Sequence, residues 1–226
     1  FPNGTNFIIA LGYAGEQVKN YILMAHPNLL VKFIEVDRWR GNGSGPGYSL
    51  WSCKAELQCP FYFIACDSLF KMDTLNTPVG KNWIGVAEVN LDDTIDYCNV
   101  SIKDGYVNSI KDKIRCGPED LSFTGLLYVQ DYKEFWQGLN SETKVENELQ
   151  ISNGLLQLID GPGLVAVEVN WDDVGSEEKY NNIIASRTEY DFSKTNEFLY
   201  FVEKRVIKFF ANPSIVSART SKASIK

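Results

Sequence analysis

Two aspartates, Asp67 and Asp173, are the side chains of this sequence that are best placed to act on a bound ligand. Asp67 follows the apolar run Phe61 to Cys66, and Asp173 follows an apolar run that ends at Trp171. In an open α/β sheet ligands bind beyond the carboxyl ends of the strands, where two such carboxylates can hold Mg²⁺ together with substrate phosphates. For either aspartate alone a turn or helix-cap role fits about as well, and spacing does not separate Asp173 from Asp172.

Three further features could take part in chemistry. The loop Gly41 to Gly47 holds four glycines, which let a backbone approach a base or phosphate closely, although a flexible connection has the same composition. This loop lacks the GxxxxGK[ST] pattern of a P-loop. Lys111 and Lys113 lie where a lysine could neutralise a phosphate or simply be solvated. His26 is the single histidine, so a Ser-His-Asp or Cys-His mechanism has little support.

Composition excludes several classes of protein. The 226 residues carry a net charge of −7, which argues against a nucleic-acid partner because phosphate binding needs clustered Lys and Arg. No apolar run approaches the roughly 20 residues that span a bilayer. The five cysteines are scattered and form no metal-ligand pattern, so we expect reduced thiols and a cytoplasmic location.

Strand and helix patterns alternate along the chain. Asn6 to Leu11 is predicted to be a strand and Glu16 to Met24 the helix that follows it. This alternation predicts an α/β fold with a doubly wound, mainly parallel sheet, to which a hairpin turning at Asp104-Gly105 adds antiparallel strands. Further helices are expected at the following segments: Asp131 to Leu139, Glu148 to Ile159, and Ser176 to Ser186. We place a domain boundary near Tyr190, which gives segments 1–190 and 191–226.

Seven stretches, in their order along the chain, resemble the sugar-phosphate nucleotidyltransferases, which have the Rossmann-like nucleotide-diphospho-sugar transferase fold. They are "IIALGYAGEQVKNYI", "GPGYSL", "FIACDSL", "VNSIKDK", "FTGLLYV", "ENELQISNGL" and "VNWDDVGSEEKY". The resemblance implies transfer of a nucleoside monophosphate from a nucleoside triphosphate to a sugar phosphate or small-alcohol phosphate, with release of pyrophosphate. Synthesis of precursors for surface polysaccharides is the setting that it suggests.

The resemblance also implies roles for individual residues. Asp67 and Asp173 would hold Mg²⁺, since the aspartate of the family lies two residues after the tryptophan, and Lys113 would bind the acceptor phosphate. The other residues that it assigns to substrate binding are Gly125 and Glu148 in the acceptor pocket, and Gly45, Gly47, Tyr48 and Ser49 beside the base.

One departure from the family pattern is large. The first strand of the family and its glycine-rich, arginine-containing phosphate loop have no counterpart, because the match begins at the second strand. We therefore expect the first β-loop-α unit to lie upstream, and this polypeptide by itself to be an inactive fragment. The strand edges left unpaired would then be covered by a homodimer or by exchange of the C-terminal hairpin.

The tail "NEFLYFVEKRVIKFFANPSIVSART" weakly resembles the first hairpin of a choline-kinase or aminoglycoside-phosphotransferase type domain, with Lys208 at the position of the ATP-binding lysine. A C-terminal hairpin that packs on the sheet explains the same pattern. For the main segment, two alternatives stay open: a glycosyltransferase that uses a nucleotide-sugar, and a non-catalytic nucleotide-binding or assembly domain of the same fold. No close Asp-x-Asp pair supports the glycosyltransferase.

Overall fold

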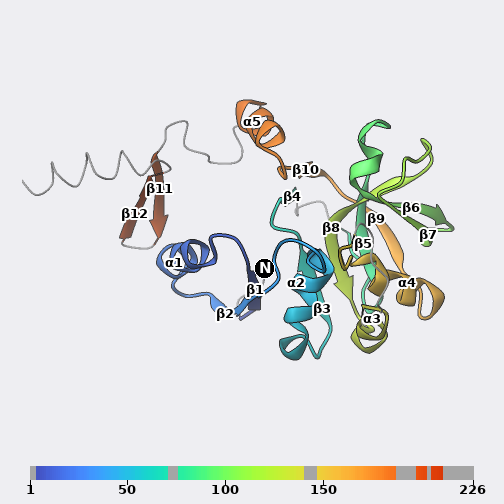
Figure 1. The fold of residues 1–226 in the computed structure, drawn as a ribbon, viewed down its shortest axis with the longest axis horizontal. Coiled ribbons are helices and arrows are strands. Elements are labelled where there is room, and N and C mark those ends of the chain that lie inside the picture. Colours follow the sequence, from blue (N-terminus) through green and yellow to red (C-terminus); the bar gives the residue numbers. More distant parts are fainter. Residues whose placement is uncertain (1–3, 71–75, 140–146, 187–196, 203–204, 211–226) are drawn as a thin grey trace, which may run out of the picture.

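The protein is a mixed α/β structure (Figure 1). The computed structural model describes residues 4–70, 76–139, 147–186, 197–202 and 205–210. Its strands form a six-stranded mixed sheet and three two-stranded pairs within these residues. Helices pack beside both the large sheet and the N-terminal pair.

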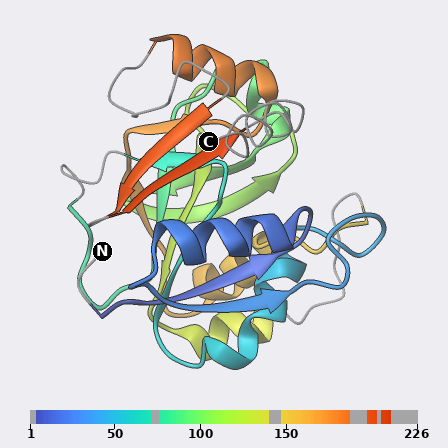
Figure 2. The same cartoon turned by 90° about the vertical axis from the view of Figure 1, so that its left-hand side faces the viewer.

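The chain begins with a strand, a helix and a second strand, as the sequence predicts. β1 (Asn6–Leu11) and β2 (Leu30–Glu35) pair in parallel, and α1 (Gly15–Ala25) connects them. Figures 1 and 2 show α1 beside these two strands. Among the described strands, β1 pairs only with β2.

The six-stranded sheet has the order β3-β8-β5-β9-β7-β6. Its strands are β3 (Phe61–Ile64), β5 (Trp83–Ala87), β6 (Cys98–Lys103), β7 (Tyr106–Asp112), β8 (Leu121–Val129) and β9 (Val165–Glu168). β8 also pairs with β6. The predicted hairpin is present, because β6 and β7 are antiparallel and join through Asp104 (φ 52°) and Gly105 (φ 78°). Two successive positive φ values are those of a type I′ turn, which suits a two-residue hairpin loop.

The prediction of a mainly parallel sheet is not confirmed. In the six-stranded sheet only β5 and β9 pair in parallel, and β8 lies antiparallel between β3 and β5. The direction of β8 is hard to predict because this strand pairs on both edges, and its Leu126 and Leu127 are almost fully buried. Its apolar half, 126–129, is typical of a buried strand in a parallel sheet as well, so composition does not reveal its direction.

The hydrophobic core lies between this sheet and three helices. α2 (Pro46–Ser52), α3 (Tyr132–Leu139) and α4 (Ser152–Asp160) supply Leu50, Phe135 and Leu155 to it. Phe61 of β3 stacks on Trp136 with ring centroids 5.4 Å apart. Burying large aromatic side chains stabilises a fold strongly, so this contact helps to hold β3 and α3 together.

α4 begins later than the sequence predicts, at Ser152 and not at Glu148. The backbone N–H of Leu149 donates to the carbonyl of Ser44 (2.9 Å), and the carbonyl of Leu149 accepts from the N–H of Gly47 (2.9 Å). These bonds occupy the backbone N–H and carbonyl of Leu149, which are then not available for hydrogen bonds within a helix. Glu148 therefore lies in an extended segment beside the glycine-rich loop.

Gly47 is required by this contact. A Cβ atom on Gly47 would lie 2.6 Å from the Leu149 carbonyl oxygen and 2.7 Å from the Gln150 carbonyl carbon, which are backbone atoms. We expect Gly47→Ala to lower the free energy of unfolding by about 3 kcal/mol, because overpacking against backbone is relieved only by moving the chain. Urea denaturation measures this. Gly41→Ala is the control, since Gly41 has φ 83° but open space around it, and about 1 kcal/mol of backbone strain is expected. An equal decrease in the free energy of unfolding of Gly47→Ala and Gly41→Ala would contradict the steric explanation.

Two small elements extend from the large sheet toward α5. β4 (Ser68–Phe70) pairs antiparallel with β10 (Trp171–Asp173), and α5 (Glu177–Ser186) follows β10 (Figure 1). Beyond them, β11 (Glu197–Val202) and β12 (Arg205–Phe210) form an antiparallel pair, so both strands predicted in the tail are present. The predicted turn between them, at 203–204, lies outside the described residues.

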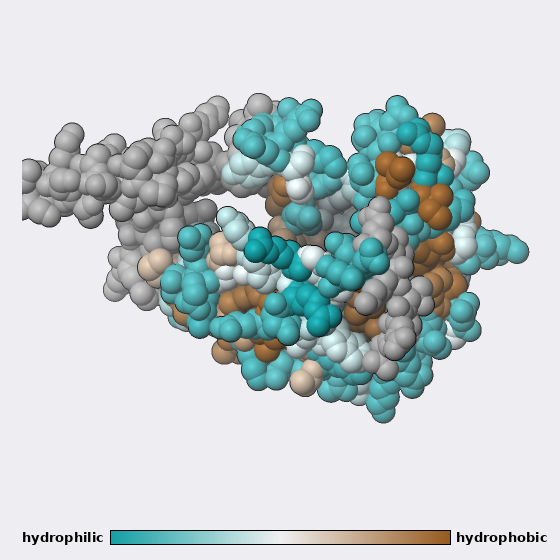
Figure 3. All heavy atoms as spheres, viewed as in Figure 1, coloured by the Kyte–Doolittle hydropathy of each residue, from teal (hydrophilic) through white to brown (hydrophobic). Residues whose placement is uncertain are grey.

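The described surface is mainly hydrophilic on the face shown in Figure 3, with hydrophobic residues visible on its right-hand side and at its lower left. Within the described ranges no helix has both the length and the apolar character that crossing a membrane requires.

Candidate active site

A pocket of about 390 Å³ lies where β3, β8 and β10 approach one another. Four of the residues singled out in the sequence line it: Asp67, Lys113, Gly125 and Asp173. The other lining residues include Ala65, Ser68, Tyr97, Asp112, Thr124, Gln150, Ser152, Trp171, Gly175 and Lys179. The pocket therefore collects carboxylates, lysines and hydroxyl groups from distant parts of the chain.

The two predicted aspartates meet in this pocket. Ser68, next to Asp67, is the pairing partner of Asp173 in the β4–β10 ladder, and the N–H of Val174 donates to the Asp67 carbonyl (2.8 Å). A Cβ atom on Gly175 would lie 3.0 Å from Asp173 Oδ1 and 3.2 Å from Asp67 Oδ2. Both carboxylates thus approach the same small volume beside Gly175.

Asp172, the rival of Asp173, does not line the pocket. Neighbouring side chains of a strand point to opposite faces, so Trp171 and Asp173 share the face that borders the pocket and Asp172 takes the other.

Asp173 is held by a compact polar cluster. Its Oδ2 accepts hydrogen bonds from the Tyr97 hydroxyl (2.5 Å) and from Lys179 Nζ (2.6 Å), while Oδ1 accepts from the Gly175 N–H (2.7 Å). Lys179 Nζ also donates to the Tyr97 hydroxyl oxygen (2.7 Å). By contrast, the Asp67 carboxylate makes no hydrogen bond or ion pair with any described residue.

These contacts set the charges of the cluster. Burial tends to raise the pKa of Asp173, but hydrogen bonds from Lys179, Tyr97 and Gly175 outweigh it and lower this pKa. Burial also opposes the charge of Lys179, yet its bonds to Asp173 and Tyr97 raise its pKa overall. Burial and the bond to Asp173 raise the pKa of Tyr97 to about 12. At neutral pH the cluster is a carboxylate, an ammonium and a neutral phenol.

Lys113 borders the same pocket from the end of β7. Its backbone is left-handed (φ 52°), and its N–H donates to the Tyr97 carbonyl (3.0 Å). Its Nζ lies 3.9 Å from Glu148 Oε2. The other candidate, Lys111, instead pairs with the buried carboxylate of Asp120 (2.7 Å) and does not line the pocket. Of the two candidate lysines, Lys113 therefore lies at the pocket, and Lys111 forms an ion pair with Asp120 outside it.

Gly125 shapes the pocket where β8 passes the end of β3. It has φ 80°, and a Cβ there would lie 2.6 Å from the Ala65 side chain. Its carbonyl accepts from the Ala65 N–H (2.9 Å), and the Ser68 hydroxyl donates to the Thr124 carbonyl (2.8 Å). These bonds position the turn that carries Asp67.

The residues predicted to lie beside the base do not line this pocket. These residues are Gly45, Gly47, Tyr48 and Ser49. Glu148, predicted for the acceptor pocket, does not line it either, although its carboxylate lies 3.9 Å from the Lys113 Nζ. Gly45 and Gly47 pack on the backbone of 148–150, and the Tyr48 hydroxyl donates to Asp37 (2.7 Å). The Ser49 hydroxyl bonds to the carbonyl of Gly45 (3.4 Å). The close backbone approach that the glycines permit is therefore made within the chain, and base binding by this segment stays a prediction.

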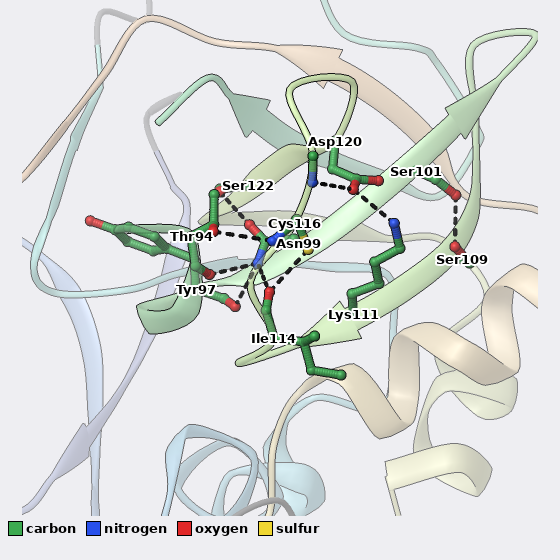
Figure 4. A network of polar contacts seen from close by, with 11 residues as sticks. Thr94, Tyr97, Asn99, Ser101, Ser109, Lys111, Ile114, Cys116, Asp120 and Ser122 are labelled. Atoms are coloured by element: carbon green, nitrogen blue, oxygen red, sulfur yellow. Dashed lines mark hydrogen bonds and ion pairs between the residues drawn. The ribbon is translucent and has the colours of Figure 1, made fainter. Parts of the chain in front are cut away.

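Sequence reasoning missed Tyr97, Lys179 and Asn99. The Asn99 amide nitrogen donates to the carbonyls of Thr94 (2.7 Å), Tyr97 (3.2 Å) and Ile114 (3.2 Å) (Figure 4). Its oxygen accepts from the Ser122 hydroxyl (2.7 Å). This buried amide ties together the turn that carries Tyr97 and the loop that follows Lys113. An asparagine inside an apolar strand is a signal that could have found it, because a buried amide needs partners.

The donor set suits a divalent cation shared with phosphate. Among the described residues, no three His, Cys, Asp or Glu side chains group together as a complete metal site. Mg²⁺ is commonly held by one or two carboxylates and completes its shell with water and phosphate oxygens. Asp67, which has no hydrogen bond or ion pair within the described ranges, and Asp173 beside it fit that pattern.

The fold is that of the sugar-phosphate nucleotidyltransferases, as comparison with solved structures shows. No protein-family model matches the chain, and no curated protein matches its sequence. A UDP-glucose pyrophosphorylase from Acinetobacter baumannii is similar in structure, with a TM-score of 0.63, 14% identity, and coverage of 80% of this chain and 76% of that one. An inositol-1-phosphate CTP transferase from T. maritima gives a TM-score of 0.58 and 16% identity, covering 80% and 75%.

A third structure, UDP-glucose pyrophosphorylase complexed with UDP-glucose, gives a TM-score of 0.57 and 17% identity, covering 78% of this chain and 74% of that one. All three are nucleotidyltransferases for sugar or cyclitol phosphates. The resemblance that the sequence motifs predicted is therefore confirmed at the level of the fold.

Proposed function

We propose that the protein is a nucleotidyltransferase that joins a nucleoside monophosphate to a sugar phosphate or small-alcohol phosphate. The observation that carries the proposal is the meeting of Asp67 and Asp173 in one pocket with Lys113. A likeness to a pyrophosphorylase solved with UDP-glucose supports it, because that complex contains the product of such a reaction.

The reaction is an in-line displacement at phosphorus. An oxygen of the acceptor phosphate forms a bond to the α-phosphorus of the nucleoside triphosphate, the bond from that phosphorus to the bridging oxygen breaks, and pyrophosphate leaves with the electron pair. Such transfers depend on positioning and on neutralising charge. Asp67 and Asp173 would hold Mg²⁺, which supplies that neutralisation when it is bound.

The remaining groups of the pocket are assigned by their chemistry. The Lys113 ammonium binds the acceptor phosphate as a compact charge with three donors. Gln150 and Ser152 border the pocket, where the Gln150 amide donates to Glu148 and the Ser152 hydroxyl to Asp112. Polar groups of this kind also pair with the hydroxyls of a sugar or polyol. Gly125 contributes by its lack of a side chain, which lets β8 pass close to Ala65 where both residues line the pocket. Synthesis of precursors for surface polysaccharides and assembly as a homodimer remain parts of the proposal.

The test is release of pyrophosphate from each of the four common nucleoside triphosphates with a panel of phosphorylated sugars and small alcohols. The protein is expressed from the start of its open reading frame, with Mg²⁺ present. We expect release above background for one nucleotide and a narrow group of acceptors. Nucleotide binding without release for any acceptor would contradict the proposal and favour a non-catalytic nucleotide-binding domain.

A further inference from the structure

Lys179 occupies an unusual position for a lysine. It lies in the first turn of α5, two residues after the helix begins at Glu177, and its backbone N–H donates to the Ser176 hydroxyl (3.2 Å). The N-terminus of a helix carries a partial positive charge, so a cation in the first turn does not stabilise the helix. The placement of this lysine therefore needs a reason outside α5.

The contacts of Lys179 give that reason. Its Nζ reaches two groups of the pocket, Asp173 Oδ2 (2.6 Å) and the Tyr97 hydroxyl (2.7 Å). A carboxylate oxygen offers about two lone-pair positions, and Lys179 and Tyr97 take both of those on Asp173 Oδ2. Oδ1 already accepts from Gly175. Asp173 is thus largely satisfied within the chain, whereas Asp67 beside it has no hydrogen bond or ion pair in the part of the chain that the structure describes.

We propose that Lys179 is a displaceable counter-ion that competes with a divalent cation for Asp173. In the absence of substrate its ammonium neutralises Asp173 and repels a second positive charge, so a free divalent cation binds weakly. When a triphosphate enters the pocket, the flexible side chain transfers its hydrogen bonds to phosphate oxygens and leaves Asp173 Oδ2 to the cation. The second half of this inference rests on the proposed function, and the first half does not.

The first half is tested with Mn²⁺ alone, by titration of the metal-free protein followed by electron paramagnetic resonance. Lys179→Gln removes the charge and is expected to tighten Mn²⁺ binding at least tenfold, while Lys179→Arg keeps the charge and is expected to stay within threefold of the native protein. Lys133→Gln, an equal change of net charge on the exposed side of α3, is the control and should leave the affinity unchanged. An affinity of Lys179→Gln equal to or weaker than that of the native protein would overturn the proposal.

The second half is tested with Mn²⁺ complexes of the four nucleoside triphosphates. Lys179→Gln is expected to bind the preferred complex at least fivefold more weakly, although it binds free Mn²⁺ more tightly. A merely structural role would change both affinities in the same direction. Lys179→Met also removes the charge and is measured in the same way. The thermal melting curves of both variants show whether the glutamine variant has a folding defect of its own.

The outcomes separate the two proposals. Tighter binding of free Mn²⁺ with no nucleotide binding by any variant leaves the counter-ion role standing and removes the proposed function. Pyrophosphate release by the native protein, together with an unchanged Mn²⁺ affinity of Lys179→Gln, supports the proposed function and removes the counter-ion role. Unchanged binding of the nucleotide complex by Lys179→Gln contradicts the transfer of the ammonium to phosphate.

Discussion

Asp67→Asn is expected to reduce nucleotidyl transfer by roughly three orders of magnitude while the protein stays folded. A metal-bound carboxylate contributes to charge neutralisation worth several kcal/mol, and each 1.36 kcal/mol changes a rate about tenfold. The substitution keeps the size of the side chain and removes only its charge. The measurement is kcat for pyrophosphate release at saturating substrate, beside a urea denaturation curve.

Asp67 is a cleaner position for this test than Asp173. Its carboxylate has no hydrogen bond or ion pair among the described residues, so its loss is expected to change the free energy of unfolding by less than about 0.5 kcal/mol. Replacing Asp173 would also release Tyr97 and Lys179, and an effect on rate would then have two explanations.

Asp172→Asn is the matched control, because it removes a charge one residue from Asp173 on the opposite face of β10. We expect near-native turnover from it. Near-native turnover from Asp67→Asn would exclude Asp67 as a cation ligand. A large loss in Asp172→Asn would show that the choice between the neighbouring aspartates is wrong.

The sequence predicts the two aspartates of the site because their positions are determined by the ends of strands. Asp67 and Asp173 each follow an apolar run, and the carboxyl ends of strands in an α/β sheet lie at one edge, so their meeting follows from local pattern and a general rule. The strand-helix-strand unit at the N-terminus is predicted for the same reason, because its apolar spacing changes from strand to helix within a few residues.

What the sequence could not show depends on contacts between distant segments. Tyr97 lies 76 residues from Asp173, and nothing in its neighbourhood indicates which carboxylate its hydroxyl will meet. The direction of β8 is equally hidden, since the apolar residues of its second half pack into the core whichever way the strand runs. The late start of α4 depends on backbone bonds from Leu149 to the glycine-rich loop, more than 100 residues earlier along the chain.

The geometry of the pocket therefore rests on residues with no chemical role of their own, and Asn99 is the strongest case. It is 1% exposed, and its amide links the carbonyls of Thr94, Tyr97 and Ile114 (Figure 4). Since Lys113 also donates its N–H to the Tyr97 carbonyl, the segments that carry Tyr97 and Lys113 are joined at one point.

Asn99→Leu is expected to lower the free energy of unfolding by about 3 kcal/mol, because three carbonyls each lose one of their donors and a lost hydrogen bond costs about 1 kcal/mol. Ser122→Ala, which removes only the donor to the Asn99 oxygen, is expected to cost about 1 kcal/mol. Urea denaturation of both variants gives the two values. Asn99→Asp keeps the shape and the acceptor for Ser122 but loses the amide hydrogens, so it should resemble the leucine variant. If Asn99→Asp is as stable as the native protein, the three carbonyls do not depend on this amide, and the positions of Tyr97 and Lys113 have another origin.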